Sequence, residues 1–359
     1  MQSRRNSEPY LANGVVYVES EHAGLYALDA TTGHKKWEFY TRSVLAQPVV
    51  NNGIVYAVGK RGLFAFNEST GAAVWEFTDP KLQTFSSPVV AAGRVYLPTM
   101  RVLYALNAET GRKVWEFEIS QVYRPVSLCN DVAYVVAYIN NATTLYALGV
   151  ADGELRWQVE INAGSALPAV TEEELHAIRK AGYPVHSDAG IREQQQSDWA
   201  DWIDKDEIRY SVGDYMLSAT DLTTNNLKWQ SDRRVSHLIT AQNGLIYACF
   251  AITGPFYGLY ALNEATGECH WSNGGWFFNL STPVTLLNET IYAGDVNNRL
   301  YALNALNGET RWTFSAPTGC IGTGITADRG YVYMVSLQTR TLYALDEATG
   351  AKRWEYSIP

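Results

Sequence analysis

Short hydrophobic runs alternate with polar turns along this chain, and a thirteen-residue pattern recurs eight times. The first copy, LYALDATTGHKKW at Leu25–Trp37, consists of two runs with strand alternation joined by Asp-x-x-Thr-Gly. Alternation with a period of two is typical of a half-buried β-strand, and a tight polar turn between two such runs is typical of a hairpin. Each copy therefore predicts a β-hairpin whose second strand carries a Trp.

The eight copies keep the same internal distances. All of them end on Trp and have Ala at the third position, and seven have Gly at the ninth position, where the remaining copy has Asn225. Gly and Asn adopt positive φ more readily than other residues, so this position predicts a left-handed turn residue. The Trp residues are Trp37, Trp75, Trp115, Trp157, Trp229, Trp271, Trp312 and Trp354. Because their phase is fixed and Ala leaves room for the indole ring, we expect a structural role for all eight.

Successive copies begin about forty residues apart, and a second pattern precedes each hairpin. Pro48–Val58 and Ser87–Leu97 are examples of it, and each supplies two more short hydrophobic runs. A period near forty with four strands is the size of a propeller blade rather than of a helical repeat. The pattern predicts an all-β chain in which residues 1–359 form a single eight-bladed β-propeller of four-stranded antiparallel blades. We call the strands of a blade A, B, C and D in chain order, and we expect each blade to be contiguous in sequence.

A long interval before the fifth copy predicts an insert. We place strand A of blade five at Leu167–Val170 and strand B at Ile208–Tyr210, which leaves residues 171–206 as a short helical insert in the A–B connection. Thr171–Gly182 has a capping box and a Gly just past its end, as a helix does. This connection would lie at the same end of the blade as the Asx-Thr-Gly turns.

A second helix is predicted from Ser197, because Trp199, Trp202 and Ile203 follow helical spacing. Either this apolar face packs on the propeller, or Trp199 and Trp202 dock a partner. Acidic residues outnumber basic ones in the insert, which would favour a basic partner surface.

These residues resemble the bacterial pyrroloquinoline-quinone-type propeller family, whose repeat carries Ala-x-Asp-x-x-Thr-Gly followed by a docking Trp. The resemblance covers almost the whole chain. It implies the propeller fold but no particular chemistry, because the repeat occurs in quinone-dependent dehydrogenases, in the lipoprotein subunit of the barrel assembly machine, and in sensor domains of receptor-like Ser/Thr kinases. The organisation of this chain is similar to that of the non-catalytic members, and the resemblance implies an extracytoplasmic location.

Composition and charge limit the classes of partner. The net charge is −9, whereas nucleic-acid binding favours a basic surface, so we expect no nucleic-acid partner. No run of eighteen apolar residues predicts a membrane span. The first eight residues are polar and lack the apolar stretch of a signal peptide. We expect a monomeric domain that belongs to a larger chain or complex.

The cysteines and acidic residues do not form a recognisable metal site. Cys129, Cys249, Cys269 and Cys320 show no Cys-x-x-Cys spacing, and no zinc or EF-hand pattern is present. Cys249 and Cys269 are predicted on strands B and D of one blade, which is too far apart for a disulfide. We expect free thiols and no metal.

Candidate binding residues fall in the connections opposite the Asx-Thr-Gly turns, where a propeller usually binds ligands. The predicted D–A loops contain Arg42, Arg124, Arg234 and His237. Together these residues would suit a carboxylate or phosphate, or they are solvated loop residues. A Gly-Gly-Trp-Phe-Phe segment adds Trp276 and Phe277, which lie outside the repeat and either bind a ligand or cap a seam between blades.

Two classes of function remain. The first is a non-catalytic scaffold or sensor domain that binds a protein partner or a small ligand, with no catalytic residue and no cofactor. The alternative is a pyrroloquinoline-quinone-dependent alcohol or sugar dehydrogenase, which would need the quinone and calcium. The chain lacks the adjacent Cys-Cys pair of the methanol-oxidising enzymes and has no recognisable catalytic spacing, so we expect the first class.

Overall fold

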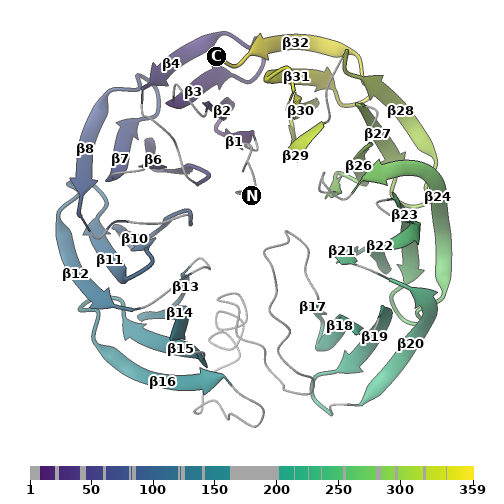
Figure 1. The fold of residues 1–359 in the computed structure, drawn as a ribbon, viewed down its shortest axis with the longest axis horizontal. Helices are drawn as coiled ribbons and strands as arrows, with labels where there is room; N and C mark the ends of the chain where they lie inside the picture. The colour runs from purple at the N-terminus through teal and green to yellow at the C-terminus, as the bar shows by residue number, and fades with distance from the viewer. Residues whose placement is uncertain are drawn as a thin grey trace. The chain divides into compact units, whose positions relative to one another are not determined.

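The computed structural model shows eight four-stranded antiparallel sheets, and no helix occurs among the residues it describes. Those residues are 9–20, 24–40, 46–59, 62–80, 82, 86–119, 122, 126–139, 142–161, 202–213, 215–224, 226–235, 237–253, 256–279, 284–295, 298–317, 321–336 and 338–359. Each sheet is contiguous in sequence, with strands A to D side by side in chain order (Figure 1). The predicted fold class, an eight-bladed β-propeller of four-stranded blades, is confirmed.

The strands are as follows. The A strands are β1 (Tyr10–Ala12), β5 (Val49–Asn51), β9 (Val89–Ala91), β13 (Ser127–Cys129), β17 (Trp202–Lys205), β21 (His237–Gln242), β25 (Thr285–Leu287) and β29 (Ile321–Asp328). The B strands are β2 (Val15–Ser20), β6 (Ile54–Gly59), β10 (Arg94–Pro98), β14 (Val132–Ile139), β18 (Ile208–Gly213), β22 (Leu245–Thr253), β26 (Thr290–Gly294) and β30 (Tyr331–Ser336). The C strands are β3 (Gly24–Asp29), β7 (Gly62–Asn67), β11 (Val102–Asn107), β15 (Ala142–Gly149), β19 (Met216–Asp221), β23 (Phe256–Asn263), β27 (Arg299–Asn304) and β31 (Thr341–Asp346). The D strands are β4 (Lys35–Phe39), β8 (Ala73–Thr78), β12 (Lys113–Glu118), β16 (Leu155–Ile161), β20 (Leu227–Arg234), β24 (Cys269–Asn279), β28 (Thr310–Ser315) and β32 (Lys352–Ser357).

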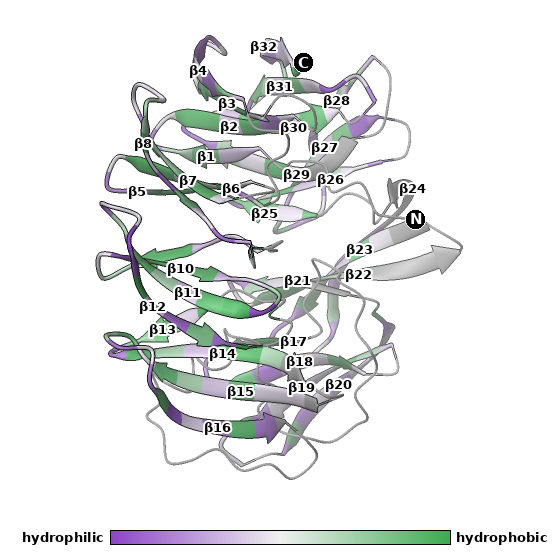
Figure 2. Ribbon diagram, turned by 60° about the vertical axis from the view of Figure 1, so that its left-hand side comes forward, coloured by the Kyte–Doolittle hydropathy of each residue, from purple (hydrophilic) through white to green (hydrophobic). Residues whose placement is uncertain are grey.

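The chain divides into two compact units. The first comprises residues 12–29 and 34–192, and the second comprises residues 1–11, 30–33 and 193–359. Within each unit the core lies between the faces of successive sheets, as in the cluster of Tyr56, Leu63, Val95 and Tyr104 from sheets two and three. The middle strands β10 and β11 are accordingly hydrophobic, whereas the edge strand β12 carries hydrophilic residues (Figure 2).

A row of three residues crosses strands B, C and D in every sheet. The repeat Ala of strand C lies opposite a Tyr of strand B on one side and the repeat Trp of strand D on the other. The rows are Tyr17–Ala27–Trp37, Tyr56–Ala65–Trp75, Tyr96–Ala105–Trp115, Tyr134–Ala147–Trp157, Tyr210–Ala219–Trp229, Tyr247–Ala261–Trp271, Tyr292–Ala302–Trp312 and Tyr333–Ala344–Trp354. The small Ala side chain lets the two rings approach across it, with centroids 5.8 Å apart for Tyr17 and Trp37. Aromatic pairs at this separation add stability beyond the burial of their area.

The indole groups also join one sheet to the next. In seven of the eight, Nε1 donates a hydrogen bond to a main-chain oxygen in the C–D turn of another sheet. The pairs are Trp37 with Glu68, Trp75 with Ala108, Trp115 with Val150, Trp229 with Glu264, Trp271 with Ala305, Trp312 with Glu347 and Trp354 with Ala30. The Gly of the same turn lies against the indole, so a Cβ on Gly111 would meet Trp75 at 2.6 Å. Gly111 is therefore required both by the close contact with Trp75 and by its positive φ of 69°.

The last sheet contacts the first C–D turn through the same interaction. Trp354 Nε1 and the Tyr333 hydroxyl both donate to the main-chain oxygen of Ala30, at 3.1 and 2.9 Å. A Cβ on Gly33 would meet Trp354 at 2.7 Å. Residues 30–33 accordingly group with the unit that contains the last sheet, although they belong to the first hairpin.

Sheet five corrects the prediction about the insert. Its strand A is β17, which pairs with β18 so that Trp202 lies opposite Ser211, and the A–B connection is only Asp206 and Glu207. The long connection of residues 162–201 therefore precedes strand A, and joins strand D of sheet four to strand A of sheet five. The predicted insert at 171–206 in the A–B connection is wrong in its placement, because Trp202–Lys205 belongs to the sheet. Trp202 and Ile203 are strand rather than helical residues, while Leu167–Val170 and Thr171–Gly182 lie outside the described residues.

Candidate functional site

Each sheet has two chemically different ends. In an antiparallel sheet the A–B and C–D connections lie at one end, which we call the turn end, and the B–C and D–A connections lie at the other, which we call the loop end. The turn end carries the repeat turns. The candidate binding residues that the structure describes lie at or near loop ends.

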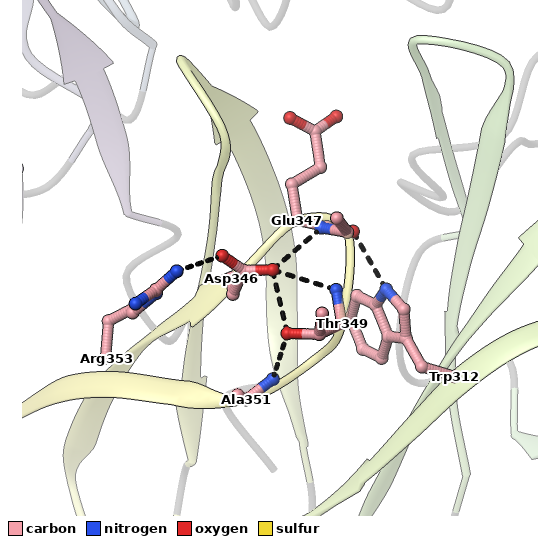
Figure 3. Close-up of polar contacts among 7 residues, drawn as sticks. Trp312, Asp346, Glu347, Thr349, Ala351 and Arg353 are labelled. Carbon is pink, nitrogen blue, oxygen red and sulfur yellow. Dashed lines mark hydrogen bonds and ion pairs between the residues drawn. The ribbon is translucent and has the colours of Figure 1, made fainter.

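The turn ends are built from one repeated hydrogen-bond arrangement. In the last sheet the Asp346 carboxylate accepts hydrogen bonds from the main-chain N–H groups of Ala348 and Thr349 and from the Thr349 hydroxyl (Figure 3). The Thr349 oxygen accepts in turn from the Ala351 N–H, and Arg353 donates to the carboxylate from strand D. Asn67 and Asn107 make the same turn with a neutral amide oxygen. These bonds satisfy the polar groups of the turn internally, which leaves few of them for a ligand.

Ionisation of Asp346 follows from these contacts. The hydrogen bond from Arg353, and then those from Thr349, lower the pKa of Asp346 to about 2. Hydrogen bonds from Thr224 likewise lower the pKa of Asp221, which occupies the same place in sheet five. Donors that stabilise the charged form account for both shifts. These carboxylates are structural groups of the turns.

An open pocket of about 440 Å³ lies at the turn ends of sheets five and six. It is lined by Ile208, Tyr210, Lys228, Trp229, Gly244, Asn263, Glu264 and Ala265. Its acid, Glu264, already accepts from Lys205 Nζ at 2.7 Å and from the Tyr210 hydroxyl at 3.1 Å. Burial, with the charge of Glu264, raises the pKa of Tyr210. Glu264 and Tyr210 of this pocket are thus engaged in contacts between sheets five and six.

The loop end of sheet five carries an exposed pair that the sequence did not indicate. Tyr215, in the B–C connection, is 62% exposed and has a φ of 64°. The Arg234 guanidinium, at the end of β20, lies 5.9 Å from the centre of the Tyr215 ring, within reach of a cation–π interaction. A hydrogen bond of 2.7 Å from the Val235 N–H to the Tyr215 main-chain oxygen holds the two connections together. Asn298 and Arg340, which also directly precede strand C, have positive φ as well, so this backbone conformation belongs to the connection and the exposed aromatic ring is what distinguishes Tyr215.

Sheet six extends beyond the usual strand length at its loop end. Strand β24 has 11 residues and β22 has 9, whereas β4 has 5. Residues expected to form loops are therefore strand residues, with Phe256 opposite Asn279 and Tyr257 opposite Phe278. The segment that contains Trp276 and Phe277 belongs to β24. The extension arises because the B, C and D strands of this sheet all continue past the point where other sheets turn.

The structure brings several predicted site residues to the loop ends of sheets five and six. Trp202 and His237 begin β17 and β21, which are neighbouring A strands, and Arg234 ends β20. Trp276 and Phe277 lie in the extension of sheet six. Arg42, Arg124 and Trp199 lie outside the described residues, so their part in a site remains a prediction. Tyr215 is the residue that sequence reasoning missed, because a single Tyr in a short connection carries no pattern.

Glu19 is a second group that the sequence reasoning missed. It lies near the loop end of sheet one, and burial raises its pKa to about 7. At the same place, two residues after the strand B Tyr, other sheets have apolar residues such as Val58, Val136 and Val335. Aligning the eight repeats residue by residue would have shown this exception.

Cysteine and metal chemistry give no centre in the described part of the chain. Cys129, Cys249 and Cys269 are free thiols, and burial raises the pKa of Cys249. Cys320 lies outside the described residues. No group of three His, Cys, Asp or Glu residues suits a metal ion among the residues described. Within the same residues, no helix is long and apolar enough to cross a membrane.

Comparison with known proteins identifies the class. Three segments, residues 1–134, 42–190 and 213–359, match the family of the outer membrane protein assembly factor BamB. The chain therefore belongs to this family of propellers with quinoprotein-type repeats, which confirms the resemblance. No curated protein matches it in sequence.

Solved structures share the fold at low sequence identity. BamB from Moraxella catarrhalis is 14% identical, with a TM-score of 0.56, over 94% of this chain and 92% of that chain. The quinohemoprotein alcohol dehydrogenase from Comamonas testosteroni is 13% identical, with a TM-score of 0.57, over 97% of this chain and 72% of that chain. The computationally designed Ika8 protein is 11% identical, with a TM-score of 0.54, over 100% of this chain and 98% of that chain. The same fold thus occurs in an assembly factor, an enzyme and a designed protein, so the fold alone does not define the activity.

Proposed function

We propose that this protein is a non-catalytic scaffold that binds a protein partner at the loop ends of sheets five and six. The observation that carries the proposal is the exposed pair of Tyr215 and Arg234. Tyr and Arg, with Trp, are the residues that most often dominate the binding energy of protein interfaces. A Tyr that is 62% exposed, with the Arg234 guanidinium 5.9 Å from its ring centre, presents an aromatic group and a cation together to solvent.

The surroundings support a protein partner. The B, C and D strands of sheet six are extended at its loop end, and the chain segment 162–201, the longest interval between two strands, leads into strand A of sheet five at a loop end. Both features distinguish these two sheets from the regular repeats. Membership in the family of an outer membrane protein assembly factor supports a role within a protein complex, and with it an extracytoplasmic location.

Affinity purification with matched variants tests the proposal. The tagged protein, Tyr215→Ala with Arg234→Ala, and Tyr40→Ala would each be purified from the source cells, and co-purifying proteins would be quantified by mass spectrometry. Tyr40, at the loop end of sheet one, is 72% exposed and serves as the control. We expect at least one protein to bind the wild type and the control, and to be reduced at least tenfold with the double variant. If every bound protein remains with the double variant, the site is wrong.

A quinone-dependent dehydrogenase is the second candidate, because the fold is also that of a quinohemoprotein alcohol dehydrogenase. Reconstitution with pyrroloquinoline quinone and calcium, followed by absorbance and by dye-linked oxidation of alcohols and sugars, would separate the two. We expect neither a bound quinone spectrum nor dye reduction. Stoichiometric quinone binding with turnover would replace the scaffold proposal.

A further inference from the structure

The D strands differ in how they protect the edges of their sheets. Strand D is the last strand of each sheet, so its outer backbone groups have no neighbouring strand within that sheet. Such edges pair readily with other chains, and proteins commonly prevent this with charged residues, Lys above all, or with bulges. Six of the eight D strands contain Lys or Arg: β4, β12, β16, β20, β28 and β32.

The two exceptions are β8 and β24. Strand β24 is irregular, because its pairing with β23 shifts between Tyr257 opposite Phe278 and Leu259 opposite Asn273. Strand β8 pairs regularly with β7, apart from the single shift beside the repeat Ala that the other D strands share. Strand β8 is therefore the regular edge strand without a basic residue.

In strand β8, Glu76 lacks the Lys partner that the equivalent Glu has in three other D strands. In β4, β12 and β32 a Lys pairs with the Glu three residues later: Lys35 with Glu38, Lys113 with Glu116, and Lys352 with Glu355, at 2.7–2.9 Å. Strand β8 has the same acid, Glu76, but Ala73 replaces the Lys. Glu76 makes no ion pair or hydrogen bond within the described part of the chain, and it is exposed.

An exposed apolar residue, Val74, lies two positions before Glu76 in β8. The residue just before the repeat Trp is bulged out of the pairing, and in six sheets it is basic or His: Lys36, Arg156, Lys228, His270, Arg311 and Arg353. In β8 it is Val74, which is 46% exposed, and in the neighbouring D strand β12 it is Val114, which is 45% exposed. The edge of β8 thus combines exposed apolar groups with an uncompensated negative charge.

We propose that β8 is a docking edge for an extended segment of a partner protein, which adds a strand to sheet two and places a Lys or Arg against Glu76. Main-chain hydrogen bonds to the edge would supply affinity, and side chains that contact Val74 and Glu76 would supply specificity. This surface lies on the edge of a sheet in the first unit, so it is independent of the loop-end site of the proposed function.

Charge selects this occupant over a second copy of the chain. The net charge of −9 opposes association of two identical chains. A symmetric pairing of two β8 strands would also bring two copies of Glu76 to one edge without a cation. An extended basic segment satisfies the acid and covers the apolar positions at once.

A selection with a matched pair of variants tests the proposal. Random decapeptides displayed on phage would be selected on the whole protein and counter-selected on Ala73→Lys, which restores the Lys–Glu pair of the other strands. Thr310→Lys is the control. Thr310 is exposed and occupies in β28 the register that Ala73 has in β8, and the substitution adds the same charge. Circular dichroism would confirm that both variants fold.

The expected peptides alternate apolar and basic residues. Their synthetic forms should bind the wild type and Thr310→Lys equally and Ala73→Lys about tenfold more weakly. Methylation of alternate peptide nitrogens should abolish binding, and bound peptide should slow amide exchange in residues 73–78. The proposal is overturned if no peptide distinguishes the wild type from Ala73→Lys, if the enriched peptides are acidic, or if sedimentation shows a dimer that Ala73→Lys dissociates.

Discussion

The turn ends and the loop ends of the sheets differ in how much freedom their residues have. At the turn ends an Asx–Thr–Gly turn and an indole from another sheet recur with nearly the same geometry, as in Asn107, Gly111 and Trp75. At the loop ends connection lengths vary, and residues such as Tyr215 are exposed. A framework fixed at one end allows the other end to diverge without loss of the fold, which is the usual relation between a scaffold and its binding loops.

The largest expected effect breaks the turn-end framework. Gly111→Val forces a β-branched residue to a φ of 69° and places its Cβ against Trp75, 2.6 Å from the ring in the present geometry. Strain at positive φ and overpacking each cost about 1–3 kcal/mol, so urea unfolding should show a loss of about 3 kcal/mol or more.

A matched pair of alanine variants separates the two causes. Gly93 has nearly the same φ, 70°, but a Cβ there would meet nothing within 4 Å. Gly93→Ala should therefore lose only the conformational part, about 1 kcal/mol, and Gly111→Ala should lose clearly more. Equal losses would show that the contact with Trp75 is unimportant.

The second prediction concerns the loop end of sheet one. In the folded state the pKa of Glu19 is raised to about 7, against 4.5 for an unperturbed Glu, so this carboxyl keeps its proton to a higher pH than in the unfolded chain. Stability should therefore fall as pH rises from about 4.5 to 7, because the unfolded chain releases the proton first. Glu19→Gln removes this loss and should be more stable than the wild type at pH 8, by up to about 3 kcal/mol.

Urea unfolding of the wild type and of Glu19→Gln at pH 4 and pH 8 would test this prediction. The free energies of unfolding of these two proteins should differ little at pH 4. Glu76→Gln removes a carboxylate from an exposed position and serves as the control. A benefit of Glu19→Gln that does not depend on pH would argue against burial as the cause.

The third prediction tests the indole hydrogen bond alone. Trp312→Phe keeps an aromatic ring but removes the donor that reaches the Glu347 main-chain oxygen at 2.8 Å. A hydrogen bond of this kind contributes about 1 kcal/mol, and some packing is lost as well, so thermal unfolding should shift down by a few degrees. Thr313→Ala, at the adjacent exposed position, should leave the transition unchanged; an equal shift in both variants would contradict a role for the indole.

The smallest effect is expected at the Asp346 turn. Its pKa of about 2, against 3.8 for an unperturbed Asp, means that its contribution to stability is present above pH 4 and is lost as pH falls toward 2. Asp346→Asn keeps the turn, since Asn107 makes it with an amide oxygen, but loses the charge opposite Arg353. The variant should be slightly less stable at pH 6, and the difference should narrow at pH 2.5. A difference that stays constant between these pH values would show that the charge does not matter.

Sequence reasoning succeeded where the repeat was strong. Eight copies with fixed spacing predicted eight contiguous four-stranded sheets, and the small Ala beside each Trp was correctly linked to the space that the ring needs. The Tyr of strand B completes the same row, but the repeat analysis did not single it out. The reason is that a strand residue's opposite partner depends on register, which the spacing of one strand does not give.

Sequence reasoning failed where the local pattern of apolar residues was weak. Strand A has only three residues in five of the eight sheets, as at Val49–Asn51 and Val89–Ala91, so an apolar run such as Leu167–Val170 was mistaken for it. Trp199, Trp202 and Ile203 fit helical spacing, yet pairing with β18 makes Trp202 and Ile203 strand residues. Short apolar runs are ambiguous between helix and strand, and only the neighbouring strand resolves them.

By itself, the sequence determined the number of sheets, the order of their strands and the positions of the turns, because these follow from local alternation and from residues that adopt positive φ. Only the tertiary structure decided which residues share a surface: that the long connection precedes β17, that Tyr215 meets Arg234, and that Lys113 forms an ion pair with Glu116. Such relations depend on register and on contacts between residues distant in the chain. A repeat defines each sheet in isolation, and packing defines what the sheets present together.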